Sequence, residues 1–200
     1  YCFTKKNIIS VICIIIYKDI HVLLYYHNII YYFYVIIKQI IYIQLIMKIL
    51  ITGGNGLVGS AIKEFVFLEK EENKGKSTQN ENEYLFISSK ECDLTNINIT
   101  RDYFSKCKPD AVVHLAAYVG GLFRNMSEKI KMYEINTQIN YNILKICDEL
   151  NINRVLSCLS TCIFPDKTIY PIDETMLHNG PPHFSNDGYA YSKRMLEVHS

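Results

Sequence analysis

Four residues near the end of the sequence have the types and spacing of a proton-transfer centre. Tyr189 and Lys193 stand four residues apart, so on a helix their side chains share one face. A nearby ammonium group favours the phenolate and lowers the phenol pKa from its usual value of about 10. The tyrosine could then pass a proton to or from a substrate oxygen near neutral pH. Ser160 could hydrogen-bond the same oxygen, and Cys162 could act as a second acid/base group.

Each of these residues also has a plainer interpretation. A tyrosine and a lysine at this spacing are common by chance, and Cys162 fits a buried structural cysteine equally well. The pair gains weight because a glycine-rich turn and a serine at the end of an expected strand precede it in the chain. Tyr191 lies off the lysine-facing position and is expected to be structural, and His114 is expected to pack within a strand.

The segment 53–59, which reads Gly-Gly-Asn-Gly-Leu-Val-Gly, has the spacing of a dinucleotide-binding turn between a strand and a helix. Gly53 would allow the turn, Gly56 would let the backbone approach a pyrophosphate, and Gly59 would let helix and strand pack closely. Free N–H groups at the positive helix end suit that pyrophosphate. A glycine turn of an unrelated α/β protein is the alternative. The cofactor-binding residues expected here are Gly53, Gly54, Asn55, Gly56, Leu57, Val58 and Gly59.

The end of the next expected strand, 84–88, indicates which dinucleotide is bound. An NAD-preferring site places a carboxylate there for the ribose 2′-hydroxyl, whereas this chain has Ser89 and Lys90. Hydroxyls and a cation would attract an adenosine 2′-phosphate. NADP(H) is therefore expected over NAD(H), although Glu91, one residue further, argues the other way.

Further cofactor contacts are expected at the adenine and where a later strand ends. Asp93 could instead be a turn or helix-capping residue, and the small residues at 115–117 could instead make a tight helix–sheet contact. The remaining expected cofactor-binding residues are Asp93 and Leu94 at the adenine, Leu115, Ala116 and Ala117 at the strand end, and Lys193 at the nicotinamide ribose.

Strands and helices are expected to alternate along residues 47–200, which indicates an α/β fold with a Rossmann-type doubly wound parallel sheet. The expected strands are 48–52, 84–88, 111–117 and 154–160, with a further short strand near 91–94. The expected helices are 57–69, 98–107, 128–150 and one from about residue 189. The third helix carries an apolar stripe that predicts core packing, formed by Ile135, Ile139, Ile143, Cys147 and Leu150. The polar segment 70–83 predicts a mobile surface loop.

Two segments of different composition make up the 200 residues. Residues 1–46 contain 15 Ile and 8 Tyr but no Gly, Ala, Pro or Arg, which is a low-complexity composition. This leader is expected to be translated upstream sequence with Met47 as the true start; a membrane anchor and a folded extension are the alternatives. Residues 47–200 are expected to form an incomplete N-terminal NADP-binding Rossmann domain, with the last strands and a C-terminal substrate domain beyond Ser200.

Charge and cysteine content exclude several classes of function for residues 47–200. The segment carries 17 Lys and Arg against 19 Asp and Glu without a basic stripe, so no nucleic-acid partner is expected. Its five cysteines are scattered and form no CxxC pair, which favours reduced thiols, a cytoplasmic location and no metal site. No membrane association is expected unless residues 1–46 are part of the native protein.

Five longer motifs are specific enough to indicate a family. They read Val-Gly-Gly-Leu-Phe-Arg-Asn at 119–125, Ser-Cys-Leu-Ser-Thr-Cys-Ile-Phe-Pro at 157–165, Tyr-Pro-Ile-Asp-Glu at 170–174, His-Asn-Gly-Pro-Pro at 178–182 and Tyr-Ala-Tyr-Ser-Lys at 189–193. Together with the glycine turn, these motifs closely resemble the GDP-L-fucose synthases, a branch of the extended short-chain dehydrogenases/reductases. The resemblance runs from Met47 to Ser200.

The resemblance implies a two-part reaction on a GDP-sugar. GDP-4-keto-6-deoxy-D-mannose would be epimerised at C3 and C5 and then reduced at C4 with NADPH to GDP-L-fucose. Tyr189 and Ser160 would stabilise the enolate oxygen, and Cys162 would take part in the epimerisations with a histidine beyond residue 200. The resemblance also implies a homodimer through the helix at 128–150 and the helix that begins near Tyr189.

Two other classes of function remain open on the sequence alone. A nucleotide-sugar 4-epimerase or 4,6-dehydratase would hold NAD and prefer an acid at the end of the strand 84–88. A dehydratase would also place an acidic pair where Thr161 and Cys162 stand. A non-catalytic dinucleotide-sensing module is the second alternative, although it would not need the Ser160 and Lys193 side chains.

Overall fold

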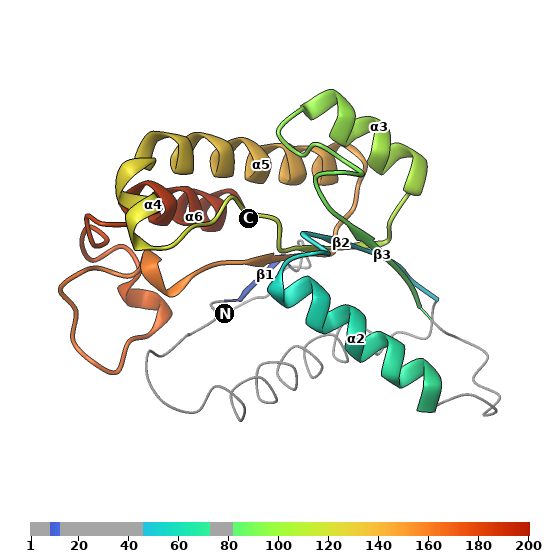
Figure 1. The fold of residues 1–200 in the computed structure, drawn as a ribbon, viewed down its shortest axis with the longest axis horizontal. Helices are drawn as coiled ribbons and strands as arrows, with labels where there is room; N and C mark the ends of the chain where they lie inside the picture. The colour runs from blue at the N-terminus through green and yellow to red at the C-terminus, as the bar shows by residue number, and fades with distance from the viewer. Residues whose placement is uncertain (1–8, 13–45, 73–81) are drawn as a thin grey trace, which may run out of the picture.

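The computed structural model describes residues 9–12, 46–72 and 82–200 (Figure 1). The strands are β1 (Ile9–Ile12), β2 (Lys48–Thr52), β3 (Glu83–Ile87), β4 (Ala111–His114) and β5 (Val155–Cys158). The helices are α2 (Leu57–Glu72), α3 (Ile97–Cys107), α4 (Leu122–Ser127), α5 (Lys129–Glu149) and α6 (Asp187–His199). Two short 3₁₀ turns, η1 (Thr161–Ile163) and η2 (Glu174–Met176), follow β5.

The five strands form one parallel sheet in the order β1-β5-β4-β2-β3. The chain starts the Rossmann half at β2 in the middle, adds β3 on one side, and returns to add β4 and β5 on the other. This order confirms the expected α/β fold with a doubly wound parallel sheet. Because all strands run the same way, the carboxyl ends of β2 to β5 meet at one edge of the sheet.

β1 lies outside β5, with Ile9–Ile12 paired in parallel to Val155–Cys158. The structure therefore places four residues of the Ile/Tyr-rich leader at the edge of the sheet. Most of the leader lies outside the described residues, as does most of the segment 70–83, so both expectations about them stay predictions. Among the helices of the described part, none is long and apolar enough to cross a bilayer.

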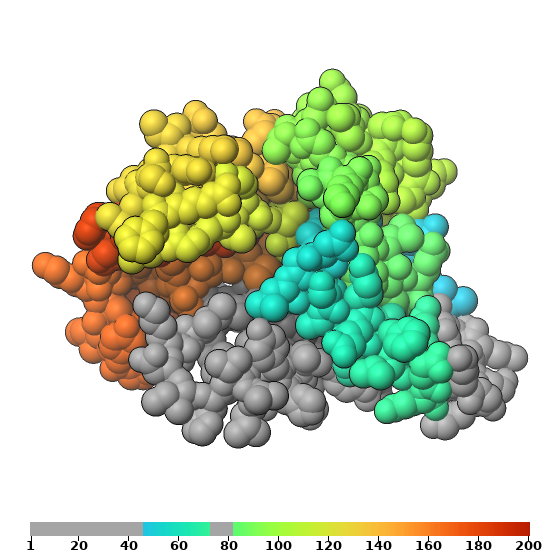
Figure 2. Space-filling view, in the orientation of Figure 1, coloured from blue at the N-terminus to red at the C-terminus, as the bar shows by residue number. Residues whose placement is uncertain are grey.

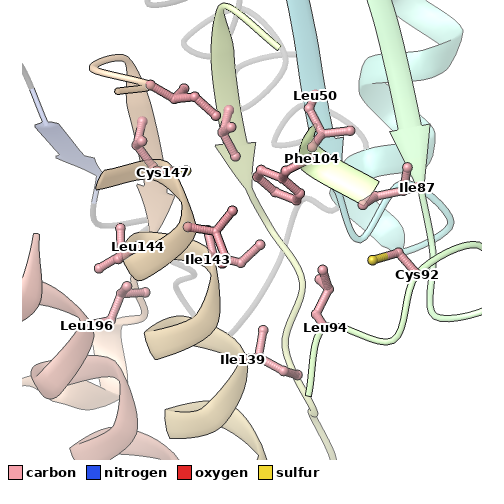
Figure 3. Close-up of a cluster of buried hydrophobic side chains, with 14 of the residues drawn as sticks. Leu50, Ile87, Cys92, Leu94, Phe104, Ile139, Ile143, Leu144, Cys147 and Leu196 are labelled. Atoms are coloured by element: carbon pink, nitrogen blue, oxygen red, sulfur yellow. The ribbon is translucent and has the colours of Figure 1, made fainter. Parts of the chain in front are cut away.

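The core has two halves because side chains alternate across the sheet. Leu50 and Val112 face α3, α5 and α6, and join Phe104 and Ile143 in a large buried cluster (Figure 3). On the opposite face, a second cluster joins Ile49 and Ile51 of β2 and Val113 of β4 to Ile62 and Val66 of α2. The helices thus cover both faces, as Figure 1 shows.

The expected apolar stripe along α5 is confirmed over most of its length. Ile139, Ile143 and Cys147 are buried in the larger cluster, and Ile135 packs against it. Leu150 is the exception, because it caps the helix end and is 36% exposed. One stripe residue therefore marks the end of the helix rather than the core.

Several element boundaries differ from the expected ones. β4 ends at His114 rather than at 117, and β5 ends at Cys158 rather than at 160, so both strand-end motifs lie in the loops that follow. A separate short helix, α4, precedes α5 and was not expected. No strand forms near 91–94 in the described structure, because the amides of Glu91 and Cys92 donate to the Ser88 carbonyl and close a turn.

Candidate active site

The structure brings the four expected proton-transfer residues together where β5, η1 and α6 meet. Ser160 caps η1, and its Oγ accepts from the Cys162 amide at 3.4 Å and from the Cys162 thiol at 3.1 Å. Tyr189 and Lys193 lie one turn apart on α6, which packs against η1. Ser160 also acts as a hydrogen-bond partner of the Tyr189 hydroxyl. The arrangement suits proton transfer, and the individual roles remain predictions.

Lys193, on α6, is buried against the end of β5. Its side chain is 2% exposed, and its Nζ donates to the Cys158 carbonyl at 2.8 Å. Burial lowers the pKa of Lys193, and the nearby thiols of Cys158 and Cys162 oppose that effect. The strand end therefore fixes the ammonium group in one place.

The expected lowering of the Tyr189 pKa is wrong for this structure. Burial raises the pKa of Tyr189 above its ordinary value, and the neighbouring thiols of Cys162 and Cys158 raise it further. The hydrogen bond with Ser160 lowers it, but the burial effect is larger. The phenol is therefore set to hold its proton, and the Lys193 ammonium is directed at a carbonyl instead.

The glycine turn folds back on itself and on the end of β4. Gly53 has φ of +70°, and a Cβ there would lie 2.9 Å from the Ala116 amide nitrogen. A Cβ on Gly59 would lie 2.4 Å from the Gly53 carbonyl oxygen. Gly59 is therefore required for packing of the helix against the turn itself, rather than against the strand. Ala116 thus packs tightly on the glycine turn, whereas the plainer interpretation of 115–117 expected a contact between helix and sheet.

The end of β3 forms a small capped turn. The Glu91 carboxylate accepts from the Ser88 amide at 2.8 Å and from the Ser88 hydroxyl, and these bonds hold the pKa of Glu91 below its usual range. Ser89 and Lys90 remain exposed beside it. The carboxylate that argued against NADP(H) is thus turned back onto its own strand end.

Asp93 behaves as a turn residue in this structure. Its carboxylate accepts from the Thr95 amide at 3.0 Å and from the Thr95 hydroxyl at 2.6 Å. Asn96, not Asp93, caps α3. The side chain of Asp93 is nevertheless exposed, and Leu94 beside it is buried. Their expected contact with an adenine stays a prediction.

A buried hydrogen-bond chain, which the sequence pattern did not indicate, links the end of β2 at the glycine turn to α6. Thr52 Oγ1 accepts from the amides of Leu115 and Ala116 at 3.2 and 3.1 Å, so its own proton goes to His114 Nδ1 at 2.9 Å. His114 Nε2 then donates to Asn140 Oδ1 at 3.0 Å. The Asn140 amide group donates in turn to the carbonyl of Ser192, between Tyr189 and Lys193 on α6, at 3.2 Å.

His114 is a packed strand residue, as expected, but it also holds this chain together. Burial and the nearby Lys193 charge lower its pKa to about 3, so the imidazole is neutral at physiological pH. A neutral ring has one donor and one acceptor, which matches the contacts with Asn140 and Thr52. A charged ring would donate to both and would repel Lys193.

Two further buried asparagines on α5 hold the loops that border the site. Asn136 exchanges two hydrogen bonds with the backbone of Tyr118, both at 2.8 Å. Asn142 donates to the Leu94 carbonyl at 2.8 Å. In the sequence, the only sign of this role is that Asn recurs on an otherwise apolar face of the helix. Helical spacing alone does not distinguish such a face from a polar surface.

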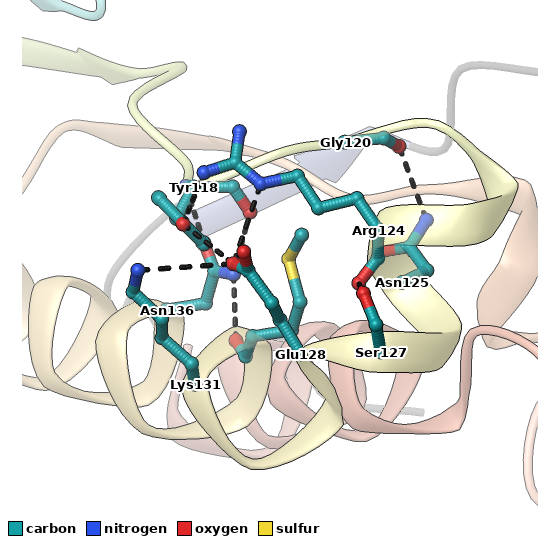
Figure 4. Close-up of polar contacts among 9 residues, drawn as sticks. Tyr118, Gly120, Arg124, Asn125, Ser127, Glu128, Lys131 and Asn136 are labelled. Carbon is teal, nitrogen blue, oxygen red and sulfur yellow. Dashed lines mark hydrogen bonds and ion pairs between the residues drawn. The ribbon is translucent and has the colours of Figure 1, made fainter.

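A charged cluster follows Tyr118 at the start of α4 and α5 (Figure 4). The Tyr118 hydroxyl donates to Glu128 at 2.7 Å, and Arg124 bonds both groups while its guanidinium lies 4.6 Å from the ring centre. Lys131 lies 5.1 Å from the same ring centre. These contacts fix the Val-Gly-Gly segment that connects β4 to α4.

Comparison with known proteins agrees with this geometry. Residues 49–199 match the NAD dependent epimerase/dehydratase family. The chain is 54% identical over 150 residues to a GDP-L-fucose synthase from Dictyostelium discoideum and 50% identical over 151 residues to a probable GDP-L-fucose synthase from Drosophila melanogaster. These alignments cover 75% and 76% of the chain but only 44% of each relative, so the chain spans less than half of their length.

A solved structure shows the same fold. It is a GDP-L-fucose synthetase from Naegleria fowleri bound to NADP, with a TM-score of 0.66 and 45% sequence identity. The match covers 76% of this chain and 46% of that one. The fold, the glycine turn and the match over three quarters of the chain lead to one conclusion: the chain belongs to the NAD dependent epimerase/dehydratase family.

Proposed function

We propose that the protein containing this chain converts GDP-4-keto-6-deoxy-D-mannose to GDP-L-fucose by epimerisation at C3 and C5 and NADPH-dependent reduction at C4. The observation that carries the proposal is the gathering of Ser160, Cys162, Tyr189 and Lys193 at one point, in a chain about half identical to named GDP-L-fucose synthases. The thiol favours this reaction over a simple 4-epimerase or a dehydratase.

NADP(H) is the proposed cofactor, and the residues present fit it. The tight glycine turn leaves Asn55, Gly56 and Leu57 exposed at the N-terminus of α2, where backbone N–H groups suit a pyrophosphate. Exposed Ser89 and Lys90 would hold the 2′-phosphate, because the competing Glu91 carboxylate is turned onto Ser88. The bound cofactor would supply the hydride for C4. Lys193 would hold the nicotinamide ribose.

In the reduction, Tyr189 would donate its proton to the C4 oxygen while Ser160 hydrogen-bonds the same atom. The raised pKa of Tyr189 suits this direction of transfer, because the phenol holds its proton until the alkoxide develops. The buried Lys193 charge would stabilise the phenolate that remains. These roles of Tyr189, Ser160 and Lys193 require only the contacts described above.

In the epimerisations, the 4-keto group would make the protons at C3 and C5 acidic. The Cys162 thiolate would remove or return a proton on one face of the sugar, and an acid/base group on the opposite face would complete each inversion. Tyr189 and Ser160 would stabilise the enolate oxygen in between. Cys162 is half-buried at the carboxyl edge of the sheet, where open α/β sheets bind ligands.

A homodimer in the cytoplasm is part of the same proposal. Large apolar side chains are exposed along the outer surface of the helices, and the α4 segment lies on that surface in Figure 2 (yellow). Phe123 is the most exposed of them, at 86%. The set includes Leu122, Phe123, Ile130, Tyr141, Met195 and Val198. Light scattering on the full-length protein would give twice the monomer mass if two such surfaces pair.

The experiment that tests the function is turnover by the full-length protein. GDP-4-keto-6-deoxy-D-mannose would be supplied with NADPH, and with NADH in a parallel reaction. The proposal expects NADPH oxidation and GDP-L-fucose as product, with slower oxidation of NADH. Binding of NADPH without oxidation would support the sensing module instead, and a product epimerised only at C4 would support a sibling enzyme.

A further inference from the structure

Arg194, the residue after Lys193 on α6, is a buried cation without a carboxylate partner in the part of the chain that the structure describes. Its side chain is 5% exposed. Its Nε donates to the Ile163 carbonyl at 2.5 Å, and its guanidinium lies 5.5 Å from the Tyr191 ring centre. Its Nη2 is buried without a hydrogen-bond partner.

A buried guanidinium affects the ionisation of the groups around it. Burying a guanidinium without a counter-ion is strongly unfavourable, and burial here lowers the pKa of Arg194. The one strong contact of the side chain is with Ile163, whose neighbour in η1 is Cys162. Arg194 therefore both holds the turn that carries the thiol and brings a positive charge to it.

Among the described residues, the groups that act on the Cys162 thiol come from its own turn and from α6. They are Ser160, Lys193 and Arg194, with the Tyr189 phenol as a further neighbour. Burial raises the pKa of the thiol, and the hydrogen bond with Ser160 and the charges of Lys193 and Arg194 lower it.

We propose that Arg194 is a positioning residue for Cys162, fixing the 3₁₀ turn through the Ile163 carbonyl and supplying a buried positive charge that favours the thiolate. The substrate does not need to touch Arg194 for this role. The consequence for the reaction, that epimerisation depends on Arg194 more than reduction does, rests on the proposed function. The effect of Arg194 on the ionisation of Cys162 does not rest on the proposed function.

Cys158 provides a matched control within the native protein. Both thiols lie close to Lys193, but only Cys162 lies in the turn whose Ile163 carbonyl accepts from Arg194. The Cys158 thiol instead donates to the Leu159 carbonyl at 3.6 Å, which favours its neutral form. Alkylation by iodoacetamide across a pH series, read at each cysteine by peptide mass spectrometry, should give a lower midpoint for Cys162. An equal or higher midpoint for Cys162 would overturn the proposal without any variant.

Two substitutions then separate charge from side-chain volume. In Arg194→Met the Cys162 midpoint should rise by about one pH unit, which is about tenfold less thiolate below the midpoint, while Arg194→Lys should keep most of the native value. Lys106→Met, which removes an exposed α3 cation, should leave the Cys162 midpoint unchanged. A folded Arg194→Met protein with the native midpoint would overturn the proposal, as would equal shifts in the two Arg194 variants.

The last test compares the two half-reactions in the full-length protein. In D₂O, epimerisation places deuterium at C3 and C5, whereas reduction consumes NADPH. Arg194→Met should lower deuterium incorporation about tenfold more than it lowers reduction, and Arg194→Lys should restore the balance. Equal losses in both would contradict a role through Cys162. If the native protein does not turn over this sugar, the proposed function fails, but the thiol midpoints still decide the role of Arg194.

Discussion

The glycine turn at 53–59 and the cluster of Ser160, Cys162, Tyr189 and Lys193 lie at the same edge of the sheet but are built in different ways. The turn is one continuous segment whose shape requires glycine, because a Cβ at Gly53 or Gly59 would clash with backbone atoms. The cluster is assembled from η1 and α6, about thirty residues apart. It is held by the buried α6 side chains of Lys193 and Arg194, which bond the end of β5 and η1, and by Asn140 of α5. A local pattern can therefore specify the turn, whereas the cluster depends on the whole fold.

The largest expected effect is at Tyr189. Tyr189→Phe should lower kcat by about 10² to 10⁴-fold, because the proton donor for the C4 oxygen is lost, while NADPH affinity stays close to native. Tyr191→Phe is the matched control, since that side chain is exposed two residues away, and it should change kcat less than twofold. Steady-state kinetics and NADPH fluorescence would measure both. Similar kcat values for the two variants would show that turnover does not depend on the Tyr189 hydroxyl.

Gly59→Ala should damage the turn instead of the cluster. The new Cβ would lie 2.4 Å from the Gly53 carbonyl oxygen, so the turn must shift, at a cost of about 1 to 3 kcal/mol in unfolding free energy together with weaker NADPH binding. Gly121→Ala is the control for stability, because a Cβ there meets nothing within 4 Å. Urea denaturation would compare the two. Equal and small losses of unfolding free energy in the two variants would show that the turn can accept a Cβ at Gly59.

This contrast also explains what the sequence could predict. The glycine spacing and the alternating apolar pattern depend on near neighbours, and both the turn and the parallel sheet followed from them. The direction of the Tyr189 pKa shift did not follow from them, because burial and the neighbouring thiols of Cys162 and Cys158 raise the pKa, and both depend on elements distant in the sequence. The roles of His114 and Asn140 could not be predicted either, since their partners are 26 to 62 residues away along the chain.

Thr52→Val should sharpen the comparison, because Thr52 directly precedes the turn and is connected to α6 through His114 and Asn140. The isosteric change removes the hydroxyl that accepts from two amides and donates to His114, and it should destabilise the protein by about 1 to 3 kcal/mol. Thr52→Ser keeps the hydroxyl and should recover most of that loss. Thermal and urea unfolding would test the pair. A valine variant as stable as the serine variant would show that the hydrogen-bond chain contributes nothing.

The neutral state of His114 predicts a pH dependence of stability. Its pKa is about 3 in the folded protein against about 6.5 in the unfolded chain, so the unfolded state binds a proton first as the pH falls. Stability should therefore be fully present above pH 6.5 and be lost progressively between about pH 6.5 and 3. Between pH 7 and 5 the loss from this group is about 2 kcal/mol.

His114→Gln isolates that loss, because glutamine does not titrate. The variant should be less stable at pH 7 but should lose about 2 kcal/mol less than the native protein on going to pH 5. Denaturation curves at the two pH values would give the difference. Parallel losses in both proteins would mean that His114 is already protonated in the folded state.

The smallest expected effect is at the end of β3. Lys90→Gln should weaken NADPH binding about tenfold, since one charge contact with the 2′-phosphate is lost, and should leave NADH binding unchanged. Lys106→Gln is the control for a general loss of positive charge. Titration calorimetry with both cofactors would measure the ratio. An equal loss for NADPH and NADH would place the 2′-phosphate elsewhere.

The most direct test of the central claim, that a thiol and a phenol divide the chemistry of one site, is the product made by Cys162→Ser. The full-length variant would be supplied with GDP-4-keto-6-deoxy-D-mannose and NADPH, and the sugar product would be identified by NMR. The account predicts a product reduced at C4 but not epimerised at C3 and C5. GDP-L-fucose formed at the native rate would contradict it.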